Sequence, residues 1–93
     1  MLDRTINHST DRITRLVRGL LTKRSIDRPV SNDDGLTEIG LSSLDIVNLM
    51  LGVEAEFAIK IPDRDMTSAN FRSIAQIDRL VCALLGKNQP GSV

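Results

Sequence analysis

Apolar residues recur at helical spacing in three parts of the chain. Near the N-terminus they fall at positions i, i+3, i+4, i+7 and i+8, which predicts an amphipathic helix over residues 3–24. The members of this stripe are Ile13, Leu16, Val17, Leu20 and Leu21. A second helix is predicted over residues 43–57, and a last one over residues 73–85, capped by Ser73 and ended by Gly86. The second helix has more apolar positions than one core-facing stripe requires, which indicates that it also contacts something else. We expect Leu44 on its core-facing side and Ile46 on the face shown to partners.

The segments between these helices carry turn-forming residues. Residues 25–42 contain Pro29 and the run Ser-Asn-Asp-Asp-Gly, and therefore predict a long loop. Ser42, with Asp45 three residues later, is predicted to cap the second helix. Pro62 predicts the start of a short third helix over residues 63–68, and residues 87–93 are expected to form a flexible tail. We interpret residues 1–93 as a single all-α domain, a bundle of four helices.

Composition is consistent with this fold and excludes several functions. The 93 residues are 41% hydrophobic and 26% charged, as in an ordinary globular domain, and include no Trp or Tyr. One Cys and one His cannot form an internal disulfide or a structural zinc site, so we expect no bound metal. No apolar run approaches the roughly 20 residues of a membrane span, and the N-terminus lacks a signal-peptide core. We therefore expect a cytoplasmic protein without a membrane span.

Charge is distributed unevenly along the chain. The 12 basic and 12 acidic residues cancel, but residues 1–28 hold seven basic against three acidic residues, and residues 33–65 hold eight acidic against two basic ones. The basic first helix supports one alternative function, a small helical adaptor or nucleic-acid-binding module that would use Arg12, Arg15 and Arg18. The zero net charge and the scarcity of aromatic residues argue against nucleic acid as a partner.

No residue is predicted to be catalytic. His8 lies near the N-terminus without a neighbouring nucleophile, and Cys82 lies in the apolar stripe of the last helix, where we interpret it as a small buried hydrophobic residue. Ser43 differs, because it would be the first residue of the second helix, with its hydroxyl in solvent at a place where phosphate is tolerated. Nothing nearby activates it as a nucleophile, so it suits modification, unless it is simply part of a Ser-Ser helix start.

Three motifs together resemble the acyl carrier protein family. They are Leu-Thr-Glu-Ile-Gly-Leu-Ser-Ser-Leu-Asp-Ile-Val at residues 36–47, Glu-Ala-Glu-Phe at residues 54–57 and Ile-Pro-Asp at residues 61–63. The resemblance covers roughly residues 33–85. It implies a four-helix bundle in which Ser43 receives 4′-phosphopantetheine from coenzyme A through a Mg²⁺-dependent phosphopantetheinyl transferase. It further implies that the thiol of this group carries an acyl, aminoacyl or peptidyl group as a thioester.

The chain also departs from the family pattern. The family usually has Asp directly before the modified Ser, where this chain has Ser42, and it shows more acidic residues on the second helix. These departures predict a specialised carrier that is recognised more through apolar contacts. If the cargo were a fatty chain, its place would be the gap between the second and third helices, although the favoured interpretation of the residues there is plain core. These residues are Met50, Val53, Ile61 and Met66.

The resemblance therefore gives one main functional hypothesis and one close alternative. We expect an acyl carrier that acts between enzymes of fatty-acid, lipid or secondary-metabolite synthesis. The alternative is an aminoacyl or peptidyl carrier loaded by a synthetase-like ligase. The expected partners are the phosphopantetheinyl transferase, an acyl- or aminoacyl-loading ligase and a downstream transferase, with the carrier itself a monomer.

Overall fold

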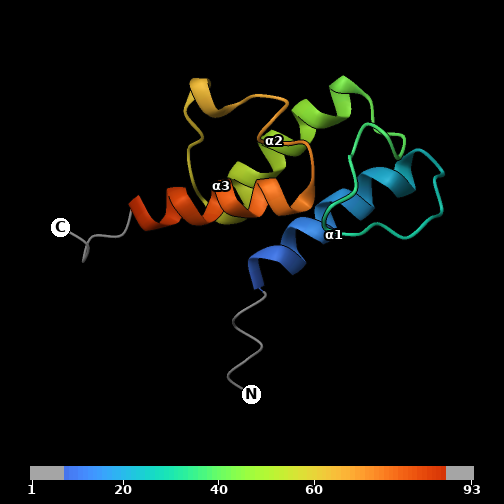
Figure 1. Cartoon of the computed structure of the whole chain (residues 1–93), viewed down its shortest axis with the longest axis horizontal. Helices are drawn as coiled ribbons and strands as arrows, with labels where there is room; N and C mark the ends of the chain where they lie inside the picture. Colours follow the sequence, from blue (N-terminus) through green and yellow to red (C-terminus); the bar gives the residue numbers. More distant parts are fainter. Residues whose placement is uncertain (1–7, 88–93) are drawn as a thin grey trace, which may run out of the picture.

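Three α-helices and one short 3-10 helix make up the regular structure of residues 8–87, the part of the chain that the computed structural model describes. The α-helices are α1 (His8–Lys23), α2 (Ser43–Phe57) and α3 (Ile74–Lys87), and the 3-10 helix is η2 (Asp63–Asp65). Helix α1 packs against both α2 and α3, and the long α1–α2 loop folds back over one end of the molecule (Figure 1). Residues 8–87 are thus all-helical, without a strand.

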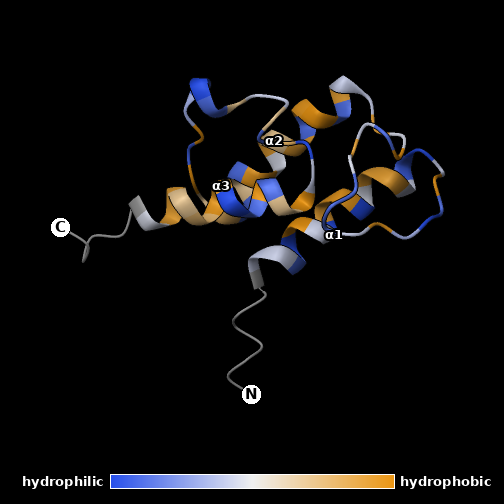
Figure 2. Cartoon of the chain, in the orientation of Figure 1, coloured by the Kyte–Doolittle hydropathy of each residue, from blue (hydrophilic) through white to orange (hydrophobic). Residues whose placement is uncertain are grey.

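One hydrophobic core joins all three α-helices and both connections between them. Each helix carries both hydrophobic and hydrophilic residues (Figure 2), and all three helices contribute hydrophobic residues to the buried core. Helix α1 contributes residues spaced four apart, as expected for one helical face. The side chains with no more than 1% exposure include Ile13, Val17, Leu36, Leu49, Val53, Ile61, Phe71, Ile74, Ile77 and Val81.

The α1–α2 loop is held to the core by backbone hydrogen bonds and a buried leucine. The Leu36 N–H donates to the Arg72 carbonyl at 2.8 Å, and the Ala75 N–H donates to the Asn32 carbonyl at 2.9 Å. Leu36 itself is fully buried. Gly40 has a φ of +123°, a backbone conformation that side chains rarely adopt, and it turns the chain toward α2. The loop therefore fixes where α2 begins relative to α1 and α3.

The predicted count of four helices is not confirmed, because the helix expected over residues 63–68 is only the three-residue η2. Its hydrogen bonds are of the i to i+3 type, from the Asp65 N–H to the Pro62 carbonyl and from the Met66 N–H to the Asp63 carbonyl. Beyond it, the Asn70 side chain donates to the Asp65 carbonyl at 2.9 Å. The Asp65 carbonyl, which a longer helix would have used, therefore accepts from this side chain and from the Thr67 N–H at 2.9 Å instead.

The ends of α1 and α3 also differ from the predicted ranges. Helix α1 runs from His8 to Lys23, and residues 3–7 of its predicted range lie outside the described residues. Helix α3 has its first N–H groups capped by the Ser73 hydroxyl, which accepts from the Gln76 N–H at 3.2 Å. It continues through Gly86 to Lys87, since glycine permits a helix end but does not impose one. The predicted tail beyond Lys87 lies outside the described residues.

The prediction that Cys82 is buried is wrong. Cys82 is exposed, while its neighbour Val81 is fully buried. The core-facing positions of α3 are Ile74, Ile77, Val81 and Leu84. Cys82 lies about 100° around the helix from Val81, because an α-helix has 3.6 residues per turn. Being apolar was therefore not enough to place this residue in the core.

Candidate functional site

A capping box defines the start of α2. The Ser42 hydroxyl accepts a hydrogen bond from the Asp45 N–H at 3.2 Å, and the Asp45 carboxylate accepts one from the Ser42 N–H at 2.9 Å. Ser42 has an extended backbone, with φ −88° and ψ 171°, as an N-cap residue should. Leu41 and Ile46 flank the cap at the two positions that form a hydrophobic staple, and both are buried. The capping interaction predicted from the sequence is thus present.

Ser43 is the first residue of α2, and it is exposed to solvent. The first turn of a helix has N–H groups without an intrahelical acceptor and lies at the positive end of the helix dipole. The Ser43 hydroxyl is therefore accessible at a place that favours a bound phosphate. This is the environment that the sequence predicted for Ser43.

Arg24, just beyond the end of α1, is part of the same arrangement. Its guanidinium forms an ion pair with the Asp45 carboxylate, and its second terminal nitrogen donates to the Ser42 hydroxyl at 3.0 Å. The hydrogen bond from Arg24, followed by the one from the Ser42 N–H, holds the pKa of Asp45 below its usual value. The same pairing raises the pKa of Arg24. Arg24 thus joins the end of α1 to the first turn of α2 and offsets the charge of Asp45 there.

Sequence reasoning did not find Arg24. It assigned this residue to the first helix and gave it no contact with Asp45, 21 positions further along the chain. No local pattern links two residues at that separation. The contact exists because the α1–α2 loop returns to the end of α1.

Helix α2 has an apolar face exposed to solvent, made of Leu44, Val47 and Leu51. Their exposed fractions are 66%, 47% and 55%. The excess of apolar positions that the sequence indicated is therefore real. The sequence nevertheless misassigned its sides, because Ile46 was expected outside and is buried, whereas Leu44 was expected inside.

The residues proposed to hold a fatty chain mostly belong to the core. Val53 and Ile61 are at most 1% exposed, Met50 is buried, and Met66 is half-buried against the same cluster. A separate hollow of about 280 Å³ lies one turn from Ser43, between the first turn of α2 and the segment before α3. It is lined by Thr37, Ile46, Ser68, Ala69, Phe71 and Arg72.

Two other features are absent from residues 8–87. No group of three or more His, Cys, Asp or Glu side chains in this part of the chain could hold a metal ion. Among the described helices, none combines the length and the apolar character needed to cross a membrane.

Comparison with known proteins assigns the chain to a family. A family model described as "Phosphopantetheine attachment site" matches residues 11–81. Aminoacyl carrier protein 1 of Bradyrhizobium diazoefficiens is 43% identical over 75 residues, which cover 81% of this chain and 83% of that protein. Aminoacyl carrier protein 2 of the same organism is 40% identical over 76 residues, covering 82% of this chain and 85% of that protein.

Solved structures give the same relationship. The crystal structure of Bradyrhizobium japonicum glycine:[carrier protein] ligase, complexed with its cognate carrier protein and an analogue of glycyl adenylate, contains a similar chain. That chain has a TM-score of 0.68 and 42% identity, with 80% of this chain and 96% of that chain covered. The complex of the same ligase with glycylated carrier protein gives a TM-score of 0.66 at 42% identity, with 76% of this chain and 96% of that chain covered.

The described residues fit the group after which this family is named. An exposed serine and a helix N-terminus coincide at the start of α2, where Arg24 offsets the charge of Asp45, and this arrangement suits a phosphate ester. The family match covers this region and most of the chain. The chain therefore belongs to the phosphopantetheine-attachment-site family, whose members are carrier domains bearing covalent 4′-phosphopantetheine.

Proposed function

We propose that this protein is an aminoacyl carrier protein and that Ser43 is the residue to which 4′-phosphopantetheine is attached. The observation that carries the proposal is the exposed hydroxyl of Ser43 at the first position of α2. When attached, the group supplies a thiol that holds the cargo as a thioester. The names of the relatives favour an amino acid as cargo over the fatty-acyl group that the family resemblance suggested first.

The chain's own residues have three roles in this proposal. Ser43 offers the hydroxyl, and the capping box keeps the first turn of α2 formed around it. Arg24 offsets the charge of Asp45, so that a phosphate ester on Ser43 does not face an uncompensated carboxylate. The exposed side chains of Leu44, Val47 and Leu51 give a partner enzyme an apolar surface beside the attachment residue.

Burial also favours a small cargo. A long alkyl chain requires an apolar interior space, whereas Val53 and Ile61 are packed within the core. The hollow one turn from Ser43 mixes apolar side chains such as Ile46 and Phe71 with the polar side chains of Thr37 and Arg72. Such a lining suits a short polar group better than an alkyl chain.

The attachment residue is tested by intact-mass spectrometry. The unmodified chain is incubated with coenzyme A, Mg²⁺ and a broad-specificity phosphopantetheinyl transferase. We expect a mass increase of one phosphopantetheine in the wild type and in Ser42→Ala, which removes the neighbouring hydroxyl, but none in Ser43→Ala. An adduct that persists in Ser43→Ala would move the site elsewhere, and no adduct in the wild type would refute the proposal.

The cargo is tested on the modified protein. It is incubated with ATP, glycine and the B. japonicum glycine:[carrier protein] ligase, and in parallel with ATP, a long-chain fatty acid and an acyl-carrier ligase. We expect a thioester-linked amino acid in the first reaction, released by hydroxylamine, and little product in the second. The opposite result would assign the protein to fatty-acyl transfer.

A further inference from the structure

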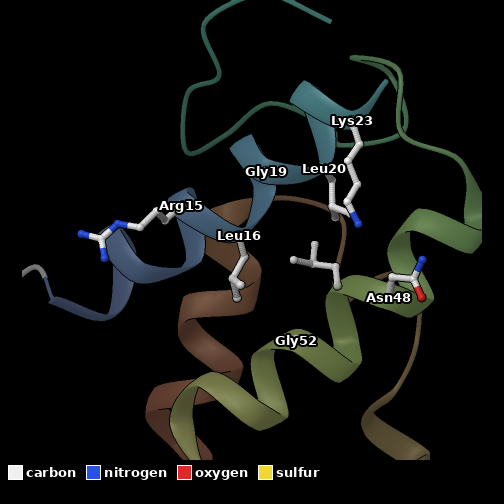
Figure 3. Close-up of a pocket in the computed structure, with 8 residues that line it drawn as sticks. Arg15, Leu16, Gly19, Leu20, Lys23, Asn48 and Gly52 are labelled. Atoms are coloured by element: carbon white, nitrogen blue, oxygen red, sulfur yellow. The ribbon is translucent and has the colours of Figure 1, made fainter. Parts of the chain in front are cut away.

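A shallow groove lies between α1 and α2, and none of its lining residues belongs to the attachment site described above. It encloses about 250 Å³. Its apolar floor consists of Leu16 and Leu20 from α1 and Leu49 from α2. Figure 3 shows Leu16 and Leu20 extending from α1 into the space that faces α2, where Gly52 and Asn48 lie. The groove is therefore an apolar depression bounded by two helices.

Two glycines in helix interiors keep this groove open. A Cβ placed on Gly19 of α1 would meet no atom within 4 Å. A Cβ on Gly52 of α2 would meet only the Leu16 side chain, at an ordinary contact distance of 3.6 Å. Alanine would therefore fit at both positions and would favour the helices more than glycine does. The packing of α1 on α2 does not require glycine at these two positions. Close approach of another molecule to the groove would require it, because glycine has no side chain.

The rim of the groove is positively charged. Arg15 and Lys23, near its two ends, are both exposed, and neither forms an ion pair within residues 8–87. Two other arginines of the same region are paired instead. Arg12 lies 2.7 Å from the Glu56 carboxylate, and Arg24 is paired with Asp45. The cations that line the groove are thus available to an outside partner.

The spacing of the two rim cations along α1 is compatible with a helical partner. Eight residues of α-helix separate Arg15 from Lys23, a rise of about 12 Å at 1.5 Å per residue. On a helix lying along the groove, carboxylates at positions i and i+7 are separated by about 10.5 Å on one face, and aliphatic residues at i+3 and i+4 fall between them. We infer that this groove docks an acidic amphipathic helix of a partner protein, with aliphatic side chains on the floor and carboxylates on Arg15 and Lys23.

This inference goes beyond the proposed carrier function, because it does not involve Ser43. The test therefore uses the full chain carrying Ser43→Ala. The probe is a synthetic, fluorescently labelled helical peptide with Glu at i and i+7 and Leu at i+3 and i+4. A second peptide has Lys in place of the two Glu. We expect the acidic peptide to bind about tenfold more tightly than the lysine peptide, a ratio that two exposed ion pairs can supply.

Charge-reversal variants locate the binding. The double variant Arg15→Glu/Lys23→Glu should lose the preference for the acidic peptide, measured by fluorescence anisotropy. The matched control is Arg64→Glu/Arg79→Glu, which reverses two exposed arginines outside the groove and should keep the preference. Amide NMR shifts on peptide addition should concentrate on the groove residues of α1 and α2. Equal loss in the control would show non-specific attraction and would overturn the inference.

A groove-filling variant tests the floor separately from the charge. Gly19→Leu places a side chain where no atom lies within 4 Å of the Cβ, so circular dichroism should show an intact helical fold. It should abolish peptide binding while Arg15 and Lys23 remain. Retained binding would overturn the inference. Light scattering on the unliganded chain provides a further check, since a dimer that Gly19→Leu dissociates would make a second copy, not an acidic helix, the occupant.

Discussion

Ser42 offers a direct measure of how the start of α2 is held together. Replacing Ser42 by Ala removes the acceptor of the Asp45 N–H, at 3.2 Å, and of the Arg24 guanidinium, at 3.0 Å. Loss of an N-cap hydroxyl costs about 1 kcal/mol, within a range of about 0.5–2 kcal/mol. In a domain of this size, a loss of about 1 kcal/mol lowers the Tm by about 4–8 °C.

The assay is thermal unfolding followed by far-ultraviolet circular dichroism, because the chain has no Trp or Tyr for intrinsic fluorescence. Two control substitutions separate capping from other effects. Ser42→Asp keeps a capping oxygen and should melt close to the wild type. Ser42→Gly should lower the free energy of unfolding by only a few tenths of a kcal/mol, since glycine is also favoured at the N-cap position.

Two results would refute this reasoning. One is a Ser42→Ala protein that melts at the wild-type temperature, which would mean that the cap contributes nothing to stability. The other is a Ser42→Asp protein that melts as low as Ser42→Ala, which would mean that a capping oxygen is not what Ser42 supplies. The series also shows how the fold responds to the Asp that the family resemblance places at this position.

Four further substitutions test stability. The pKa of Asp45 lies below its unfolded value of about 3.9, so its interactions stabilise the fold above about pH 4 and are lost as the pH falls through the lowered pKa. The difference in free energy of unfolding between Asp45→Asn and the wild type, measured by urea unfolding, should therefore be largest at pH 7 and should shrink as the pH falls below 4. Leu36→Ala leaves a cavity at a fully buried position and should lower the free energy of unfolding by about 2–5 kcal/mol in the same assay. An unchanged urea midpoint would contradict the role of Leu36 as the anchor of the loop. Gly40→Ala should lower the free energy of unfolding by about 1–3 kcal/mol, because the backbone φ is +123° and the added Cβ would lie 2.6 Å from the Ile26 side chain. Gly19→Ala should instead raise the Tm, because its Cβ would meet no atom within 4 Å and alanine favours a helix more than glycine does.

Local features of the site could be predicted from the sequence because they depend on residues close together in the chain. The capping box needs only Ser42 and Asp45 three positions apart, and both its hydrogen bonds are present. The exposure of Ser43 follows from its place at the first position of a capped helix. The excess of apolar residues on α2 can likewise be counted along the chain, because it depends only on which residue types occupy the helix.

The faces of the helices could not be assigned with the same success. Helix α2 is apolar on so much of its circumference that the sequence does not show which side meets the core. Ile46 is buried and Leu44 is exposed, the reverse of the expectation. The prediction for Cys82 is wrong for a related reason, since this apolar residue lies next to the core-facing positions of α3 but is exposed. The position of the neighbouring helices decides these cases.

The amino-acid sequence by itself determined an all-α chain, the start of its second helix and the serine that stands there, because helical periodicity and capping act over three or four residues. Only the tertiary structure brought Arg24 to Asp45, reduced the expected third helix to one 3-10 turn and opened a basic groove between α1 and α2. These features depend on how the long loop returns to the core and how two helices pack. Contacts between residues so far apart in the chain exist only once the folded core has fixed the distances between its elements.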